Sequence, residues 1–420
     1  METIMNERKF QTPYFVIDED QLTRDFEMLK DSLDGSWPNY RIGYSFKTNS
    51  VPWLVTFLKK KGVMAEVVSD DEYALASWLG FEDDEVVYNG PVKVRESFEK
   101  VLLAGGIVNM DGRRELDWLE EIAAANPDKL LEIGIRVNFN LEKMCPGQTT
   151  MGEAGGRFGF AYENGTFAKV VERVRAISNV RIAGLHLHSS SKSRSVAVFE
   201  AIASMACRLK QEFDFELSYV DLGGGYCGGL PNRPQYPDYF PAVAAVLEQE
   251  FDPAETTLIV EPGISLLSKA TTFVTGVVDV RDIGEERYLI TDGSRFNIDP
   301  TMIKPSHLFH LDLDPANPSE RALMEHQCVS GYSCMEVDRL FEYENGPELM
   351  EGDRIVYENV GGYTMSLNPL FIKYFPDIYI RRNGELLRVR KRWTPKEYVA
   401  NSVLCGEEES LPCGSGKEEL

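Results

Sequence analysis

The sequence lacks any apolar run close to the roughly 18 residues that a membrane-spanning helix needs, so we predict no membrane partner. Positive charge is also scarce, with 44 Lys and Arg against 67 Asp and Glu. The formal net charge of −23 argues against a nucleic-acid partner, because phosphate backbones are bound through clustered cations. The first residues lack the apolar core and small-residue cleavage site of a secretory signal, which predicts a cytoplasmic protein.

Cysteine and histidine are sparse as well, with seven and five residues, and no two cysteines have CxxC spacing. An odd count without such spacing is typical of reduced thiols. His186 and His188 would face the same side of a strand, but no cysteine or carboxylate spacing completes a zinc site with them. We therefore predict no metal site and expect His186 to be a hydrogen-bonded core histidine.

Short runs rich in β-branched residues recur up to residue 263, with amphipathic helical stretches between them. Strands that alternate with helices imply a parallel sheet, and eight of them predict a closed (β/α)₈ barrel. The active site of such a barrel lies at the carboxyl ends of its strands. The eight runs are residues 41–47, 65–69, 85–90, 106–111, 131–138, 181–188, 218–225 and 257–263.

After about residue 270 the pattern changes to strands with few helices between them, which predicts a second, mostly antiparallel domain. Asn383 and Gly384 both tolerate positive φ and predict a hairpin turn inside the last run. The predicted strands lie in residues 271–280, 286–293, 353–361 and 377–389.

Lys47 ends a strand-like run in which Ile42, Tyr44 and Phe46 alternate with small residues. A lysine in this place would lie at the carboxyl end of the first barrel strand, where the active site is expected. Taken alone, it would more often be a surface lysine in a strand-to-helix turn, since lysines are mostly exposed.

Other predicted strand ends carry residues of the same kind. Glycines 223–225 follow an apolar strand, where bare amides can approach a phosphate, although a tight turn would need glycine too. Glu261 would need a partner if buried, such as an arginine, a helix end or a protonated pyridine. With Lys47 for an imine and His188 as a ring platform, these features together are what pyridoxal 5′-phosphate requires.

These motifs resemble those of the fold type III pyridoxal-phosphate decarboxylases, the family of diaminopimelate decarboxylase and eukaryotic ornithine decarboxylase. The resemblance implies an alanine-racemase-type (β/α)₈ barrel over residues 19–270 and a β-domain made of residues 1–18 and 271–400. It also implies a homodimer with shared active sites, while residues 401–420 read as a polar tail. The motifs occur in the family's order: TPYFVID, YSFKTN, GRFGF, GLHLHSSS, DLGGGY, EPG, GYSCMEVD and GGYTM.

By this resemblance Lys47 looks like the imine lysine, Glu261 like the partner of the pyridine nitrogen, and His188 like the residue stacked on the cofactor ring. Cys334 matches the cysteine that the neighbouring subunit contributes to reprotonate the α-carbon. The residues that resemble the phosphate contacts are Ser191, Gly223, Gly224, Gly225 and Tyr363.

The chain departs from the family at substrate positions. Met335 stands where members usually have an acidic residue that holds a distal ammonium, and Ile264 replaces the arginine of EPGR. Asp299 lies near another arginine position, while Asp338 matches an acidic position. Because a buried ammonium without a partner costs several kcal/mol, we expect a substrate whose distal amine is acylated or otherwise neutral.

The leading hypothesis is therefore a cytoplasmic α-decarboxylase for a substrate such as citryl-2,3-diaminopropionate, in siderophore biosynthesis. Arg295 and Lys304 could meet the extra carboxylates of a citryl group, unless they are ordinary solvated charges. The alternatives are a diaminopimelate, ornithine or lysine decarboxylase, an amino-acid racemase, and a non-catalytic protein that binds pyridoxal phosphate.

Overall fold

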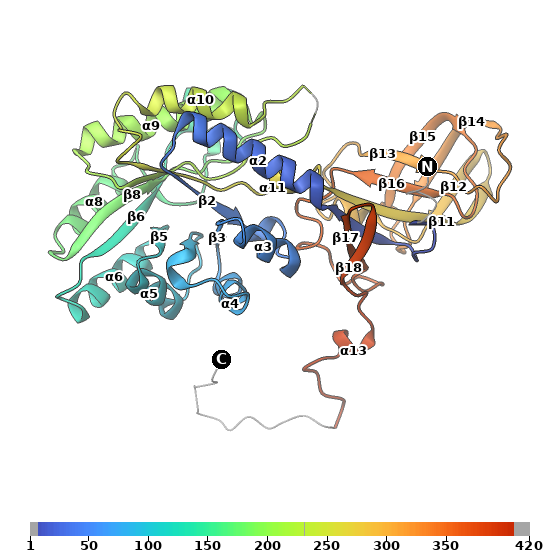
Figure 1. Cartoon of the computed structure of the whole chain (residues 1–420), viewed down its shortest axis with the longest axis horizontal. Coiled ribbons are helices and arrows are strands. Elements are labelled where there is room, and N and C mark those ends of the chain that lie inside the picture. The colour runs from blue at the N-terminus through green and yellow to red at the C-terminus, as the bar shows by residue number, and fades with distance from the viewer. Residues whose placement is uncertain (1–6, 231, 407–420) are drawn as a thin grey trace.

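A computed structural model describes residues 7–230 and 232–406, which form a barrel joined to a β-rich domain (Figure 1). Eight parallel strands close the barrel in the order β5-β4-β3-β2-β10-β9-β8-β6, since β5 also pairs with β6. A two-residue strand, β7 (Phe160–Ala161), pairs with β6. The eight strands are β2 (Tyr40–Ser45), β3 (Met64–Val67), β4 (Val86–Tyr88), β5 (Ile107–Met110), β6 (Leu131–Asn138), β8 (Val180–His186), β9 (Tyr219–Asp221) and β10 (Thr257–Val260).

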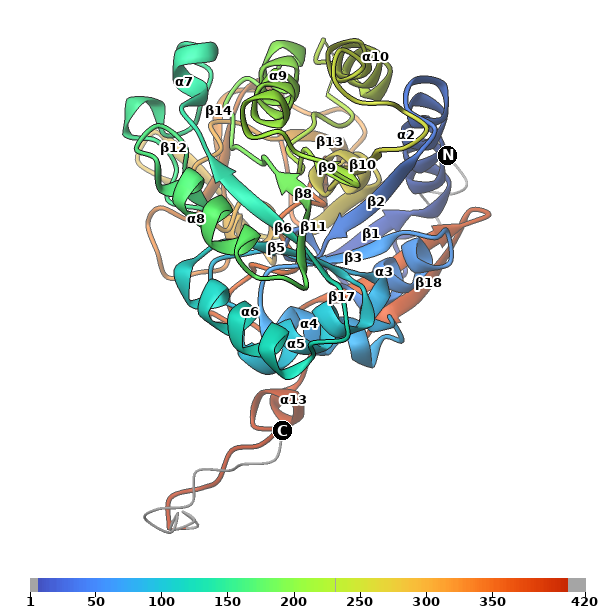
Figure 2. The same ribbon diagram turned by 90° about the vertical axis from the view of Figure 1, so that its left-hand side faces the viewer.

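Helices surround these strands on the outside of the barrel (Figure 2). Polar side chains begin several of them: Asp18, Ser69 and Ser195 each accept a hydrogen bond from a backbone amide of the first turn. The helices are α2 (Glu19–Ser36), α3 (Pro52–Lys59), α4 (Asp70–Trp78), α5 (Arg95–Ala104), α6 (Arg113–Ala125), α7 (Leu141–Met144), α8 (Thr166–Arg175), α9 (Val196–Phe213), α10 (Tyr236–Leu247) and α11 (Ile264–Leu267).

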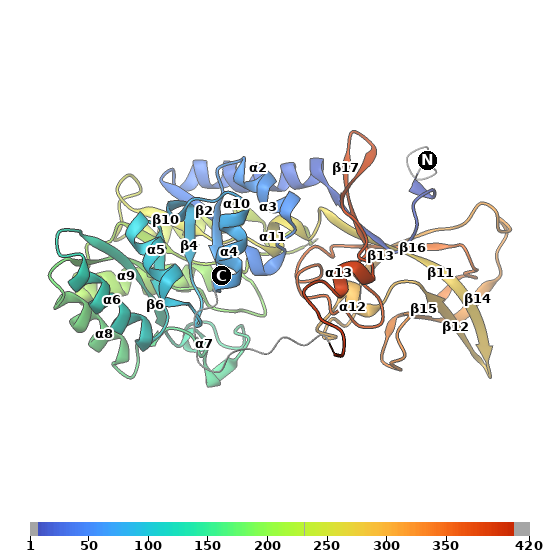
Figure 3. The ribbon, with the colours of Figure 1, turned by 90° about the horizontal axis from the view of Figure 1, so that it is seen from below.

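The second domain is a nine-stranded, mostly antiparallel sheet beside the barrel (Figure 3). Strand β1, from the start of the chain, lies between β11 and β17, so both ends of the described chain contribute to this domain. Its strands are β1 (Tyr14–Asp18), β11 (Thr271–Ile283), β12 (Glu286–Thr291), β13 (Leu308–Asp312), β14 (Leu323–Ser330), β15 (Arg339–Pro347), β16 (Arg354–Glu358), β17 (Asp377–Arg382) and β18 (Glu385–Arg390), with short helices α12 (Arg295–Ile298) and α13 (Pro395–Tyr398).

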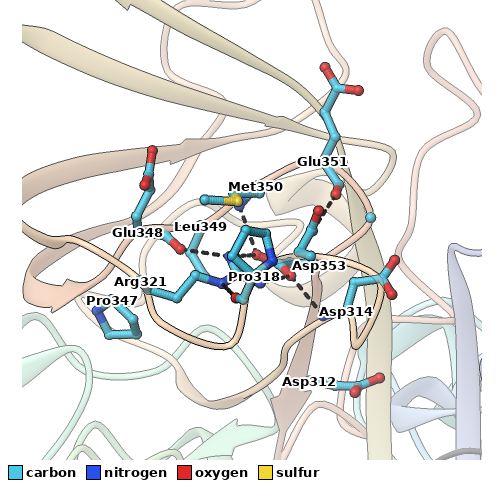
Figure 4. Close-up of polar contacts among 12 residues, drawn as sticks. Asp312, Asp314, Pro318, Arg321, Pro347, Glu348, Leu349, Met350, Glu351 and Asp353 are labelled. Atoms are coloured by element: carbon cyan, nitrogen blue, oxygen red, sulfur yellow. Dashed lines mark hydrogen bonds and ion pairs between the residues drawn. The ribbon is translucent and has the colours of Figure 1, made fainter.

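A buried ion pair fastens the loops at one end of this sheet (Figure 4). The two terminal nitrogens of Arg321 lie 2.9 and 3.0 Å from the two carboxylate oxygens of Asp353. The amides of Asp314 and Met350 donate to the same carboxylate at 2.8 and 2.7 Å. Burial alone would raise the pKa of Asp353, but these donors outweigh it and hold the pKa below its ordinary value.

The structure confirms the predicted fold class, since all eight predicted barrel strands are present. The predicted hairpin turn joins β17 to β18, with φ of 51° at Asn383 and 79° at Gly384. The sequence pattern does not predict strands β13, β14 and β15. Of the predicted tail, residues 407–420 lie outside the described residues. None of the described helices is both long and apolar enough to cross a membrane.

Candidate active site

The carboxyl ends of the barrel strands surround a cavity of about 510 Å³. Lys47 lies in a 3-10 turn, Phe46–Thr48, directly after β2, and Glu261 directly follows β10. His186 ends β8, and His188 lies two residues beyond it. All four side chains line the cavity, whereas glycines 223–225, Ser191 and Tyr363 are not among its lining residues.

Lys47 is held by a carboxylate that is itself buried. Its Nζ donates hydrogen bonds to Oγ of Ser45 at 2.6 Å and to Oε2 of Glu66 at 2.7 Å. The side chain of Glu66 is 1% exposed, while that of Lys47 is 39% exposed toward the cavity. Burial alone would lower the pKa of Lys47, but Glu66 and Glu261 outweigh it and raise the pKa. The amine therefore carries a proton that it must lose before it can attack a carbonyl carbon.

Asn89, one residue after β4, joins Glu66 to Glu261. Its Nδ2 donates to Oε1 of Glu66 at 3.1 Å and also to Oε1 of Glu261. Its Oδ1 accepts from Asn109, which also donates to Asp221 at 3.1 Å. A continuous hydrogen-bonded chain thus runs under the cavity from the lysine to the glutamate.

The two histidines are neutral rings stacked nearly parallel, with centroids 6.3 Å apart. Burial lowers the pKa of His188 to about 3, and its Nδ1 accepts a hydrogen bond from the amide of Gly224 at 3.2 Å. His186 is buried as expected, but the hydrogen bonds expected for it are wrong: among the described residues neither ring nitrogen has a partner. Its Nε2 faces Oε2 of Glu261 at 3.7 Å.

The glycine turn after β9 is required by close packing. A Cβ at Gly223 would lie within 2.7 Å of the His188 ring, and one at Gly224 would lie 2.1 Å from the carbonyl oxygen of Glu261. The amide of Gly223 donates to Asp221 at 2.9 Å, and that of Gly224 is bonded to His188. Only the amide of Gly225, at φ of 102°, has no hydrogen-bond partner among the described residues.

The segment between β6 and β8 forms one wall of the cavity. Residues 137–142, 149, 151–152 and 155–158 all face the cavity. Arg136 anchors the base of this wall through a 2.9 Å ion pair with Asp111, whose other oxygen accepts from the amide of Gly159 at 3.0 Å. Arg136 also stacks on Phe158 at 4.6 Å.

Residues 19–268, most of the barrel, match the family described as the pyridoxal-binding domain of pyridoxal-dependent decarboxylases. The chain belongs to this family. Its whole length is also similar to solved enzymes: diaminopimelate decarboxylase from M. jannaschii in complex with L-lysine superposes with a TM-score of 0.82, 22% identity, and coverage of 96% of this chain and 94% of that one.

Two curated relatives of this decarboxylase are similar to it over most of its length. A probable chloroplastic diaminopimelate decarboxylase of Oryza sativa subsp. japonica is 25% identical, over 93% of this chain and 79% of the relative. The L-glutamyl-[BtrI acyl-carrier protein] decarboxylase of Niallia circulans is 24% identical, over 94% and 95%. Six further relatives, from bacteria and archaea, are named diaminopimelate decarboxylases and are 24 to 26% identical.

The strand-end residues of the pyridoxal-dependent decarboxylase fit its cofactor. The cavity holds a lysine, a buried carboxylate and two neutral imidazoles, and the ring nitrogens of His186 have no hydrogen-bond partner among the described residues. Tyr363, at φ of 57°, is tied to the lysine turn by a 2.8 Å bond from its amide to the carbonyl of Thr48. Ser191 makes a backbone bridge to Thr149 of the cavity wall.

The residues predicted to meet substrate lie in the β-domain, and none of them lines the cavity above Lys47 of the same chain. Cys334 and Met335 are exposed. Asp338 is buried, and its oxygens accept from Oγ of Ser294 and from the amides of residues 295 and 333. Arg295 forms a 3.0 Å ion pair with Asp299.

The sequence interpretation missed the residues that support the site from below: Glu66, Asn89, Asn109, Asp111, Arg136 and Asp221. Each interrupts or directly follows an apolar strand, and a polar residue in such a place indicates a buried hydrogen-bond partner. Glu66 in AEVVS is the clearest case, because an ionised side chain inside a buried parallel strand needs a partner.

Proposed function

We propose that this decarboxylase removes the α-carboxyl group of an amino acid whose distal amine is acylated, such as citryl-2,3-diaminopropionate in siderophore biosynthesis. The observation that carries the proposal is the apolar Met335 directly after Cys334. The next carboxylate along the chain, Glu336, is exposed, while the buried Asp338 already accepts hydrogen bonds from three donor groups of its own chain. Met335 and Asp338 are therefore both unsuited to hold a free distal ammonium.

The residues around the cavity have separate roles in this reaction. When bound, pyridoxal phosphate supplies the electron sink that decarboxylation of an α-amino acid requires. Lys47 would hold the cofactor covalently, Glu261 would face the pyridine nitrogen, and His188 would cover one face of the ring. The loop wall from β6 would exclude water from the reacting carbon.

We further propose a homodimer in which Cys334 acts in the partner's site, delivering a proton from Sγ to the α-carbon after carbon dioxide leaves. In support, Cys334 is exposed and lies outside the cavity of its own chain. Exposed apolar side chains occur in the segment around Cys334 and in other loops of the β-domain, which is typical of a surface that a partner protein covers. They include Ile303, Met335, Val337, Phe371 and Ile372.

Diaminopimelate is the second candidate substrate, because relatives such as those of Oryza sativa and Aquifex aeolicus are named diaminopimelate decarboxylases. A third is a glutamyl group joined to an acyl-carrier protein, as the name of the Niallia circulans relative states for that enzyme. Such a substrate would also lack a distal ammonium.

The deciding experiment compares kcat/KM for citryl-2,3-diaminopropionate, a glutamyl thioester, diaminopimelate, ornithine and lysine, with products identified by mass spectrometry. We expect an acylated or thioester substrate to exceed every free diamino acid at least tenfold. A clear preference for diaminopimelate, ornithine or lysine would contradict the proposal.

A further inference from the structure

A second cavity, of about 260 Å³, lies in the β-domain and shares no lining residue with the cavity above Lys47. Its walls come from the segment before β17, the segment after β18, and the GYSC motif. The side chains that matter for its chemistry are Asn297, Tyr332, Lys373, Tyr374, Arg392 and Trp393.

Two cations face this cavity. Nζ of Lys373 makes one long hydrogen bond, 3.3 Å, to the carbonyl oxygen of Asp292 and lies 4.7 Å from the ring centre of Tyr332. Arg392 donates to the carbonyls of Thr12 and Pro13, while its Nε has no hydrogen-bond partner among the described residues. Burial lowers the pKa of Lys373; Asp292 partly opposes this shift, and repulsion from Arg392 adds to it.

The acidic side chains near the cavity already accept hydrogen bonds from other groups of the protein. None lines it among the described residues. The carboxylate of Asp292 accepts from Thr12, Thr275 and the amide of Gly276. Asp377 approaches Arg392 and Arg388 only at 3.6 Å, and accepts instead from the amide of Arg392. Two like charges held at one cavity without a lining acid favour an anionic ligand.

We propose that this cavity binds a carboxylate at the distal end of the substrate. The inference rests on the proposed function, because Tyr332 lies two residues before Cys334, in the segment proposed to reach the partner's active site. Arg295 and Lys304, which the sequence suggested for the carboxylates of a citryl group, already have partners within the chain. Arg295 is paired with Asp299, and Nζ of Lys304 donates to the carbonyl of Ile298 at 3.0 Å.

Calorimetric titration of citrate into the protein loaded with pyridoxal phosphate tests the site without turnover. We expect citrate to bind, and Lys373→Met to weaken its affinity about tenfold or more, since a charge-assisted hydrogen bond is lost. Lys373→Arg should restore most of the affinity. Lys396→Met makes the same change of charge on the exposed helix α13, outside the cavity, and should bind citrate like the wild type.

Equal citrate affinity in wild type and Lys373→Met, or no citrate binding to the wild type, would overturn the assignment. Inorganic phosphate is the comparison titrant, and tighter binding of phosphate than of citrate would also overturn it, because the site would then be specific for phosphate groups. These results are independent of the proposed function: if no acylated amino acid were decarboxylated, the function would fail while the citrate titration still decided the cavity.

Discussion

Glu66, within β3, and Glu261, directly after β10, accept hydrogen bonds from the same nitrogen, Nδ2 of Asn89. Glu66 in turn holds Lys47 at 2.7 Å. One carboxamide therefore fixes both the carboxylate beside the reactive amine and the carboxylate proposed to meet the pyridine nitrogen. Its donor capacity is fully used, since each Nδ2 hydrogen has one of these oxygens as its acceptor.

Asn89→Asp should weaken binding of pyridoxal phosphate at least tenfold. The substitution keeps the shape of the side chain but replaces a donor with a third carboxylate between two others, and like charges at this distance repel strongly when buried. The added negative charge should also raise the pKa of Lys47 further. Spectroscopic titration of the bond between Lys47 and the cofactor should show the same direction of shift for the imine nitrogen, and equilibrium dialysis measures the affinity.

Asn179→Asp is the matched control for that substitution. Asn179 precedes β8 at the opposite end of the barrel, where its Nδ2 donates to three backbone carbonyls. The control should lower stability without changing cofactor affinity or the lysine titration. If Asn89→Asp behaved like Asn179→Asp, the bridge would be a packing feature only.

Lys47 should be the residue that carries the cofactor covalently. Purified protein should show a visible absorption band that disappears on borohydride reduction, and peptide mapping should then find the reduced pyridoxyl group on Lys47. Lys93 is the informative comparison, because it is a fully buried lysine near the site but is held by Glu115 at 3.0 Å and by two carbonyls. Recovery of the label on Lys93, or on any other lysine, would refute the assignment.

Asp353→Asn should lower the free energy of unfolding by about 3 kcal/mol at pH 7, because it leaves the buried guanidinium of Arg321 without its counter-charge. The folded-state pKa of Asp353 lies below its ordinary value of 3.8, so its contribution is complete above that value. The contribution is lost as pH falls through the lower folded-state pKa. Urea unfolding should therefore show the difference between wild type and variant shrinking below about pH 3.8.

Asp282→Asn provides the exposed counterpart. Asp282 also pairs with an arginine, Arg287, at 3.1 Å, but its side chain is 69% exposed. Exposed pairs contribute about 0 to 1 kcal/mol, so this variant should unfold nearly as the wild type does. A similar decrease in the free energy of unfolding in both variants would show that burial does not make the Asp353 pair more stabilising than an exposed pair.

The barrel could be predicted from the sequence because each of its strands is buried on both faces and reads as a short apolar, β-branched run. Strands β13, β14 and β15 carry no such signal. In β14, LMEHQCVS, and in β15, RLFEYENGP, exposed and buried residues are mixed, since these strands form an outer part of the sheet. Their pairing depends on partners distant in the chain.

The site was predictable where chemistry and position coincide. Lys47 and Glu261 are ionisable residues at the ends of apolar runs, and the structure places both at one cavity. The bridge through Asn89 was not predictable, because its two acceptors are 23 and 172 residues away in the chain. Likewise, the sequence could not show that the amides of Gly223 and Gly224 are bonded to Asp221 and His188, so that of these three glycines only Gly225 has an amide without a partner among the described residues.

Cys334→Ala should retain cofactor binding but lose most turnover, or release an aldehyde formed by protonation at the wrong carbon. The reason is that the proposed role of the thiol is confined to proton delivery after carbon dioxide leaves. Cys328→Ala is the control, since that thiol is buried in β14 and faces Ser330 at 3.5 Å. Its loss should affect stability rather than the product.

Mixing Cys334→Ala with Lys47→Ala separates a shared site from a site within one chain. If the partner supplies the cysteine, a mixed dimer contains one site with both residues intact, and a random mixture should regain about a quarter of the wild-type activity, because half of the dimers are mixed and each has one of its two sites restored. Differently tagged chains allow the mixed dimer to be isolated and its formation verified. Activity no higher than that of the single variants, in a mixed dimer of verified composition, would show that Cys334 does not act across the interface.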